Sequence, residues 1–181
     1  INSSSDRVDR ALNAVLGEQT TGASVNSVSV NEASTRIVFE ITATSTISLN
    51  SVVAEFTPSA DATSADADAA DFSSSPIVVE YYVGGSWTTT KPSSLAANTP
   101  LKVSLRNINN DSVFEDAQAF SLKANVGNGQ GTDIFGVGTI YDDGTGDIFN
   151  NDGTLNTTAI KDDDRPVTVS SPTVNEASPY T

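Results

Sequence analysis

Short stretches in which hydrophobic and polar residues alternate fill the middle of the chain. In 37–41 and in 52–56 every second residue is hydrophobic, so each stretch places one face on a core, as a half-buried β-strand does. Four further strand candidates are separated by Gly, Asn, Asp, Ser and Pro: Ile77 to Val83, Leu101 to Ile108, Ala119 to Val126 and Ile134 to Tyr141. Several short strands with turn signals between them predict an all-β fold, an antiparallel β-sandwich.

A Gly84-Gly85 pair lies between two of these stretches. Glycine adopts the positive φ angles that tight hairpins need, so the pair predicts a hairpin that joins 79–83 to 87–90. Trp87, which follows the turn, is interpreted as a core or hairpin-packing aromatic.

The start of the chain has a different pattern. Hydrophobic residues recur at steps of three and four between Ser5 and Gly17, which predicts a short N-terminal helix that packs or links. The polar stretch Glu18 to Ser24 reads as a connection. Pro58 to Ala70 is rich in Ala, Ser, Thr and Asp without apolar periodicity, so a long exposed loop is expected there.

An internal repeat defines the organisation of the chain. The run Val30-Asn31-Glu32-Ala33-Ser34 recurs as Val174-Asn175-Glu176-Ala177-Ser178, as in a tandem array. The predicted parts are an N-terminal helix and linker (1–24), a β-sandwich module (25–148), an inter-repeat linker (149–172) and the start of the next repeat (173–181).

Charge and composition exclude several functions. The formal charge of −14 repels nucleic acid and anionic lipid. The chain has no Cys, His or Met, which excludes thiolate and imidazole metal sites, Ser-His-Asp catalysis and disulfides. No apolar run is long enough to span a membrane. Because the chain begins at Ile1 without a signal peptide, we expect an internal fragment of a polypeptide whose export signal lies elsewhere.

Acidic residues are concentrated in the predicted loops. They fall into five groups: Glu32; Asp66, Asp68 and Asp71; Asp111, Glu115 and Asp116; Asp142 and Asp143; and Asp162 to Asp164. Loops of a sandwich collect at its two ends, so carboxylates distant in sequence can converge on Ca²⁺, which takes six to eight oxygen ligands. The alternative, solvated loop acids without an ion, stays open on the pattern alone.

Over about Val28 to Gly146 the sequence resembles the Calx-β type repeats of large bacterial repeats-in-toxin (RTX) adhesins. The matching pieces are Val30-Asn31-Glu32, Ala70-Asp71-Phe72, Leu101-Lys102-Val103, Asn110 through Glu115 to Phe120, and Gly138 to Asp143. The segment Asp162 to Pro166, with the second Val-Asn-Glu-Ala-Ser run, is similar to inter-repeat junctions of type I secreted, biofilm-forming adhesins.

The resemblance implies a Calx-β/Ig-like sandwich that binds calcium at its loop ends and near module junctions. It implies one calcium cluster formed by Glu32, Asp71, Asp111, Glu115, Asp142 and Asp143. The candidate metal ligands also include Asp116, and Asp162, Asp163 and Asp164 with Glu176 as a second site shared with the next module. Three departures from the family pattern, Asn110, Gln118 and Gly144, each remove a negative charge and imply fewer ions or weaker binding.

The leading hypothesis is a calcium-rigidified scaffold or extender module of a bacterial cell-surface adhesin, extracellular and monomeric in isolation. Its expected partners are neighbouring repeats, or an inserted ligand-binding domain that the module hosts or flanks, and no nucleic acid. The alternative is a ligand-binding module in which loops near Tyr81, Tyr82 and Trp87, or Asp61 to Asp71, recognise glycan or peptide. A glycoside hydrolase needs only paired carboxylates, but the chain lacks the aromatic residues that line a sugar cleft, and we expect no enzyme.

Overall fold

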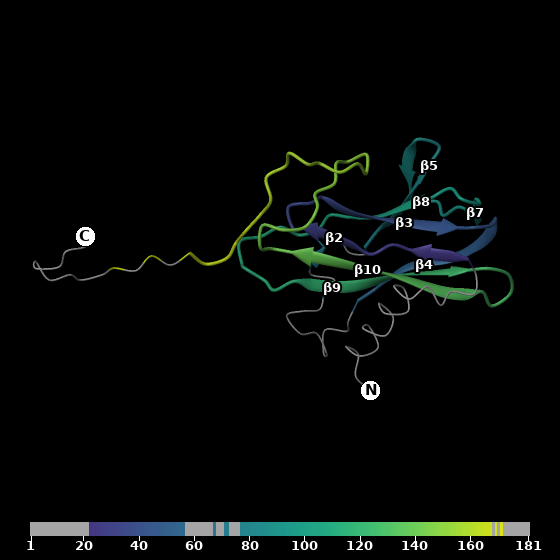
Figure 1. The fold of residues 1–181 in the computed structure, drawn as a ribbon, viewed down its shortest axis with the longest axis horizontal. Coiled ribbons are helices and arrows are strands. Elements are labelled where there is room, and N and C mark those ends of the chain that lie inside the picture. The colour runs from purple at the N-terminus through teal and green to yellow at the C-terminus, as the bar shows by residue number, and fades with distance from the viewer. Residues whose placement is uncertain are drawn as a thin grey trace, which may run out of the picture.

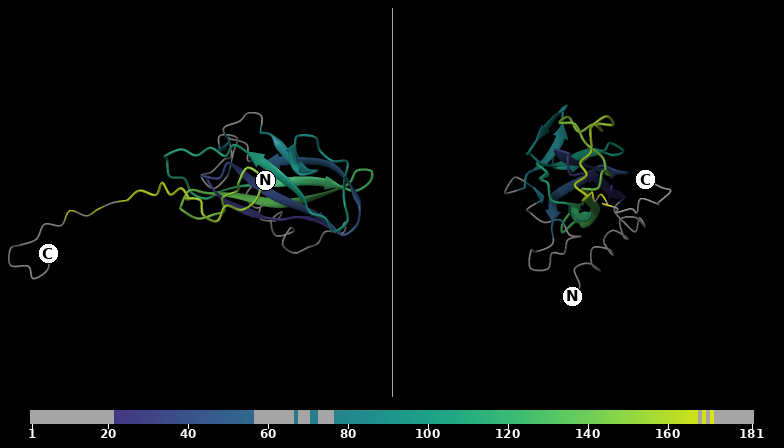
Figure 2. Two further views of the ribbon diagram at one scale, coloured as in Figure 1. Left: turned by 90° about the horizontal axis from the view of Figure 1, so that it is seen from above. Right: turned by 90° about the vertical axis from the view of Figure 1, so that its left-hand side faces the viewer.

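The computed structural model describes residues 22–56, 67, 71–72, 77–167, 169 and 171, and its described residues form an all-β fold. Its strands are β1 (Ala23–Val25), β2 (Val28–Asn31), β3 (Arg36–Ala43), β4 (Ile47–Glu55), β5 (Val79–Val83), β6 (Ser86–Thr88), β7 (Ser94–Leu95), β8 (Leu101–Arg106), β9 (Gln118–Val126) and β10 (Thr132–Tyr141). They form two five-stranded sheets, in the orders β1-β3-β8-β5-β6 and β2-β10-β9-β4-β7 (Figure 1). The two sheets lie face to face (Figure 2), as in a β-sandwich.

The first two strands follow each other closely in the chain but belong to different sheets. β1 pairs with β3 in the first sheet, antiparallel, and β2 pairs with β10 in the second, parallel. Elsewhere the strand pairs of both sheets are antiparallel. The crossing after β1 therefore ties the sheets together along one side of the sandwich.

Aromatic rings fill the space between the sheets. The Phe120 ring is fully buried and lies 5.2 Å from that of Phe56, 5.8 Å from that of Phe72 and 6.0 Å from that of Phe39, centroid to centroid. Phe39 and Phe120 come from opposite sheets, so these contacts hold the two layers together.

The alternating pattern placed the main strands correctly. The stretches 37–41, 52–56 and the four further candidates overlap β3, β4, β5, β8, β9 and β10. The hairpin at Gly84-Gly85 is confirmed: both glycines have positive φ, 63° and 88°, and β5 pairs with β6 across them. The predicted helix at 5–17 lies outside the described residues, and so does most of the predicted loop 58–70. Ala67, within that loop, is buried and donates its N–H to the Ala119 carbonyl at 3.0 Å, so the loop is not exposed there.

The segment expected to be an inter-repeat linker folds back on the sandwich for much of its length. The Trp87 indole N–H donates to the Asn151 carbonyl at 3.0 Å, and the Arg36 guanidinium lies over the indole ring at 4.7 Å. Trp87 also packs edge-on against Tyr82, 5.1 Å away, which confirms its interpretation as a hairpin-packing aromatic. The loop that runs from the end of β10 to Asp164 is therefore anchored to the outer face of the β3-β8-β5 sheet.

Gly153 packs this loop against the indole ring of Trp87. A Cβ at Gly153 would lie 2.6 Å from Cζ2 of Trp87, and the residue has φ +80°. Gly153→Ala is expected to lower the free energy of unfolding by about 2–3 kcal/mol, the sum of left-handed strain and displacement of the indole. Gly129→Ala is the matched control, because Gly129 has φ +67° with open space around it, and should lose only about 1 kcal/mol. Equal losses in urea unfolding would show that the Trp87 contact does not hold the loop.

Candidate metal centre

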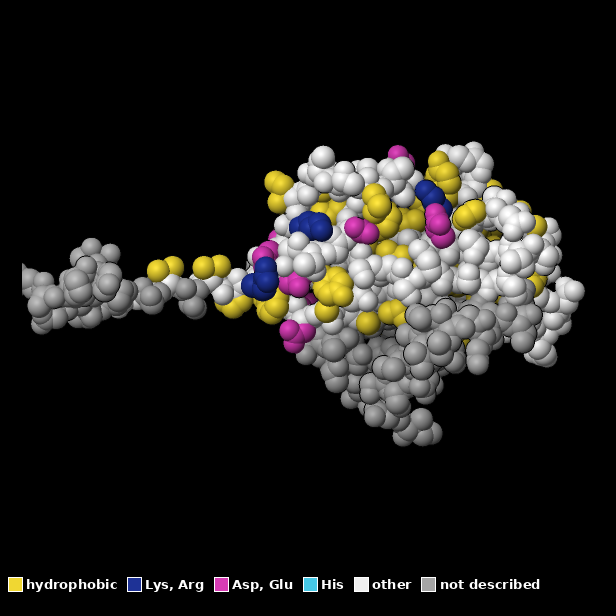
Figure 3. Space-filling view, in the orientation of Figure 1, with side chains coloured by type: hydrophobic (Ala, Val, Ile, Leu, Met, Phe, Trp, Pro, Cys, Tyr) yellow, Lys and Arg dark blue, Asp and Glu magenta, His cyan; other side chains and the backbone are white. Residues whose placement is uncertain are grey.

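Acidic side chains gather at the end of the sandwich where β10 finishes and the C-terminal segment leaves (Figure 3). Asp142 follows β10 directly and is buried, and 162–164 returns to the same place. Asp143 and Asp163 form an isolated antiparallel bridge there, and Gly144 donates its N–H to the Asp162 carbonyl at 2.8 Å. The backbone thus brings the end of the last strand and the acidic run side by side.

Three carboxylates form the centre of this group. Asp142, Asp162 and Asp164 each offer an oxygen, and these oxygens all lie within 4.8 Å of one another. Two oxygens on opposite sides of a calcium ion are about 4.6–5.2 Å apart, since Ca–O distances are about 2.3–2.6 Å. Asp164 Oδ2 is buried and accepts no hydrogen bond within the part of the chain that the structure describes. This donor set, oxygen only and with one buried oxygen unused, fits a hard divalent cation.

A second set of carboxylates borders the first. Glu32 Oε1 accepts a hydrogen bond from the Asp111 N–H at 2.9 Å, and Asp142 Oδ2 accepts one from the Glu115 N–H at 3.1 Å. The loop between β8 and β9, which carries Asp111 and Glu115, is therefore held on the cluster by the carboxylates themselves. Asp71 lies near enough to act electrostatically on Glu115.

The pKa values record the crowding of negative charge. Burial, with the charges of Asp142, Asp111 and Glu115, raises the pKa of Glu32 to about 7 although the Asp111 N–H opposes the shift. Desolvation and neighbouring carboxylates also raise the pKa of Glu115 and of Asp164. The charges that act most strongly on these three groups all belong to carboxylates. Without a cation the cluster is thus electrostatically unfavourable, and a divalent ion would relieve it.

Asn31 holds the returning segment in place and was missed by the sequence analysis as a site residue. Its side chain is fully buried; Oδ1 accepts from the Asp162 N–H at 2.7 Å, and Nδ2 donates to the Asp162 carbonyl at 3.0 Å. The signal was available, because Asn31 recurs as Asn175 in the repeat. This pair of bonds fixes the backbone from which the Asp162 and Asp164 carboxylates project.

The structure brings together six candidate ligands, with Asp71 close to them: Glu32, Asp111, Glu115, Asp142, Asp162 and Asp164. Asp162 and Asp164, expected in a separate site with the next module, belong to the same cluster as Asp142.

The other described candidates either have partners of their own or are exposed. Asp163 pairs with Arg165 at 2.6 Å, Asp143 accepts from the Thr145 N–H at 3.0 Å, and Asp116 is exposed. Hydrogen bonds from Thr145 and Arg165, respectively, lower the pKa of Asp143 and of Asp163, so both are stabilised as anions without an ion. Glu176 lies outside the described residues.

The side-chain amides of Asn110 and Gln118 each bind a carboxylate of the cluster. The Asn110 amide donates to Asp162 Oδ2 at 2.7 Å, and the Gln118 amide donates to Glu115 Oε2 at 3.1 Å. Each amide occupies one carboxylate oxygen of the cluster. Fewer oxygens of the cluster are then free to bind an ion.

The aromatic residues near the β5-β6 hairpin are buried or half-buried: Tyr82 and Trp87 are half-buried and pack against each other. Tyr81 is buried in the core, and Trp87 is covered by Arg36 and by the loop at Gly153. A glycan site on these rings would need an exposed face, so nothing in the described residues favours the ligand-binding alternative there.

Comparison with known proteins adds no relative. No family model matches the chain, and neither a curated protein nor a solved structure matches it significantly. None of the described residues forms a helix long and apolar enough to cross a membrane.

Proposed function

We propose that the chain is a calcium-stabilised structural module of an extracellular bacterial adhesin, of the Calx-β type found in RTX proteins. It serves as a scaffold or extender that holds binding domains away from the cell surface and so supports adhesion and biofilm formation. It is secreted by the type I route as part of a tandem array, contacts neighbouring repeats or an inserted domain, and is not an enzyme.

The strand order supports the fold part of the proposal. A first strand shared between the sheets, then the orders β3-β8-β5 and β10-β9-β4, corresponds to the arrangement of Ig-like sandwiches. In such a fold the first strand begins at one pole of the sandwich and the last strand ends at the other. The acidic cluster lies at the pole from which the C-terminal segment leaves, which is where a spacer needs stiffness (Figure 1).

One observation carries the calcium part: carboxylates from distant loops converge with a buried oxygen left unused. Glu32 follows β2, Asp111 and Glu115 lie between β8 and β9, and Asp142 follows β10. Asp162 and Asp164 lie still further along the chain. An ion bound here would connect all of these segments, and it would bind only the folded chain. Binding of that kind stabilises the fold by mass action.

Thermal unfolding with and without calcium tests the proposal. With free calcium at about 100 times Kd the native state gains about 2.7 kcal/mol, which raises Tm by about 5–10 °C for a chain of this size. Calorimetric titration should show uptake of at least one ion per chain. Sodium chloride at matched ionic strength controls for screening of the net charge of −14. No uptake, together with a Tm that responds equally to both salts, would refute calcium binding.

A further inference from the structure

Two valines on the C-terminal segment are strongly exposed. Val167 is 90% and Val169 87% exposed, on the stretch of chain that leaves the module beyond the acidic cluster. Hydrophobic side chains stand on this stretch clear of the sandwich (Figure 3). Two valines at alternate positions are the pattern of a strand with one apolar face.

The internal repeat gives these valines a counterpart. Aligning Val174 with Val30 places 167–178 on 23–34, so that Val167 falls on Ala23 and Val169 on Val25. The correspondence extends upstream of the shared Val-Asn-Glu-Ala-Ser run, because Val169 matches Val25 and Ser171 matches Ser27. In this alignment residues 167–169 correspond to β1.

In the module that the structure describes, β1 is largely buried. Ala23 and Val25 are only 3% and 4% exposed, because β1 pairs with β3 and both side chains join the core, while Ser24 between them faces out. Thr168 takes the place of Ser24, so the polar position is also kept.

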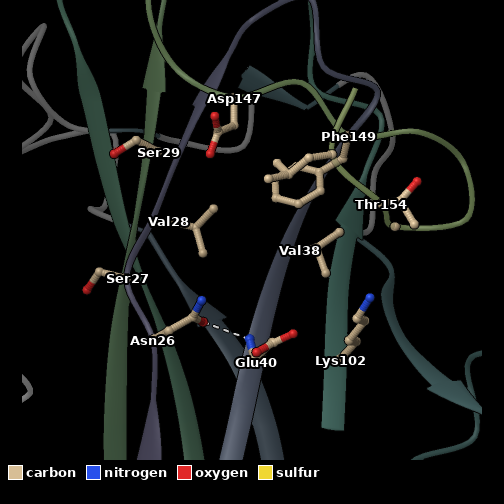
Figure 4. Close-up of a pocket in the computed structure, with 12 residues that line it drawn as sticks. Asn26, Ser27, Val28, Ser29, Val38, Glu40, Lys102, Asp147, Phe149 and Thr154 are labelled. Atoms are coloured by element: carbon tan, nitrogen blue, oxygen red, sulfur yellow. Dashed lines mark hydrogen bonds between the residues drawn. The ribbon is translucent and has the colours of Figure 1, made fainter. Parts of the chain in front are cut away.

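The residues that follow 167–169 are also compatible with the course of the chain after β1. Asn26 still bonds to β3 through the Glu40 N–H, and beyond it the chain leaves β3 toward the second sheet, beside a groove of about 620 Å³ (Figure 4). Ser27 Oγ accepts from the Val137 N–H at 3.2 Å, and Ser171 keeps this hydroxyl. Pro172 falls on Val28, the first residue of β2, which is where a strand tolerates proline.

We propose that Val167, Thr168 and Val169 form the first strand of a following module of the same fold, paired with that module's counterpart of β3. The next unit then begins at Val167 and not at 173, and only Arg165 and Pro166 separate it from Asp164. Glu176 takes the place of Glu32 in the next module and does not share a site with Asp162 to Asp164. The inference rests on the tandem arrangement within the proposed function and is independent of calcium.

A tandem protein tests the register. Residues 1–181 are joined directly to residues 38–166, because Thr181 corresponds to Ile37. Scanning calorimetry should give about twice the unfolding enthalpy of the single chain. In hydrogen exchange the unique junction peptide, which contains Val167 and Val169, should be protected in the tandem protein and unprotected in the single chain.

Substitutions separate the strand from a mere linker. The double substitution Val167→Asp and Val169→Asp should split the thermal unfolding transition of the tandem protein in two, because it buries two charges in the second module. The half of the unfolding enthalpy that belongs to this module should then appear at a Tm about 10 °C or more lower. The same pair in the single chain should leave Tm unchanged. Val167→Ala with Thr168→Ser restores the β1 sequence and should keep one transition. Val83→Asp, at a valine that is 44% exposed at the end of β5, is the control.

Three results would overturn the inference: enthalpy no greater than that of the single chain, a junction peptide that exchanges equally fast in both proteins, or no splitting by the aspartates. The series is run in calcium and in chelator. Splitting in both, without calcium uptake, would keep the register while refuting the calcium proposal.

Discussion

Glu32→Gln is expected to change Tm in opposite directions depending on calcium. In chelator at pH 8 the substitution removes a buried charge crowded by Asp111 and Asp142, while the amide oxygen can still accept the Asp111 N–H. The gain is about 1 kcal/mol after allowance for solvent screening, or a Tm rise of about 2–4 °C. In millimolar calcium the same substitution removes a negative charge from the cation's surroundings, and Tm should fall below that of the unchanged protein.

The pH dependence follows from the same carboxylate. The pKa of Glu32 is about 7 in the folded protein and near 4.5 in the unfolded chain, so between these pH values the folded state holds a proton that the unfolded state has lost. In chelator, the contribution of this group to the free energy of unfolding is complete below about pH 4.5 and is lost as the pH rises through 7. The advantage of Glu32→Gln should therefore be absent at pH 5 and complete at pH 8. Calcium affinity should rise across the same interval, because binding releases the proton.

Glu40→Gln is the matched control for this test. It makes the same change of charge on β3, on the outer face and away from the cluster. It should shift Tm equally in calcium and in chelator. If Glu32→Gln behaved in the same way, with no reversal of sign, Glu32 would not belong to a cation site.

The sequence predicted the scaffold well because local patterns determine it. Alternation fixes which face of β3 and β9 is buried, and a Gly-Gly pair fixes the hairpin turn, so neither requires knowledge of distant contacts. The acidic loops were predictable for the same reason, since each follows or precedes a strand whose end is evident. That they meet at one pole follows from the sandwich itself.

What the sequence could not show depends on contacts between distant segments. The run 149–164 has no apolar period, and its return to the sandwich rests on Trp87, Asn31 and the pairing of Asp143 with Asp163. Neighbouring residues of extended chain point to opposite sides. Asp142 and Asp164 therefore face the cluster while Asp143 and Asp163 face away. The two runs of aspartates in the sequence do not indicate which member of each run faces the cluster.

Within the proposed function, the position of the cluster lets a bound calcium ion stiffen the point at which the chain leaves the module. Asp142 Oδ1 accepts the Asp164 N–H at 3.3 Å, and its other oxygen accepts the Glu115 N–H. One side chain thus connects the last strand, the β8-β9 loop and the departing chain. A cation on this carboxylate would restrain all three, and through Arg165 and Pro166 it would restrain whatever follows.

Asp142→Asn is accordingly expected to have the largest effect on calcium binding. The substitution removes the charge at the centre of the three-carboxylate group and replaces an acceptor with an NH₂ donor that opposes either the Glu115 or the Asp164 N–H. Calcium affinity should fall roughly 100-fold, about 2.7 kcal/mol, and most of the calcium-dependent rise in Tm should disappear.

Asp133→Asn provides the control for that loss. Asp133 is an exposed carboxylate near the start of β10, at the opposite pole of the sandwich, and it too accepts a side-chain hydrogen bond, from Asn125 at 2.7 Å. The change in net charge is identical, so any effect of Asp133→Asn on affinity measures long-range attraction alone and should be less than about twofold at 0.15 M salt. Equal losses for the two variants would mean that calcium responds only to the overall charge of the chain, and that the carboxylates around Asp142 do not bind it.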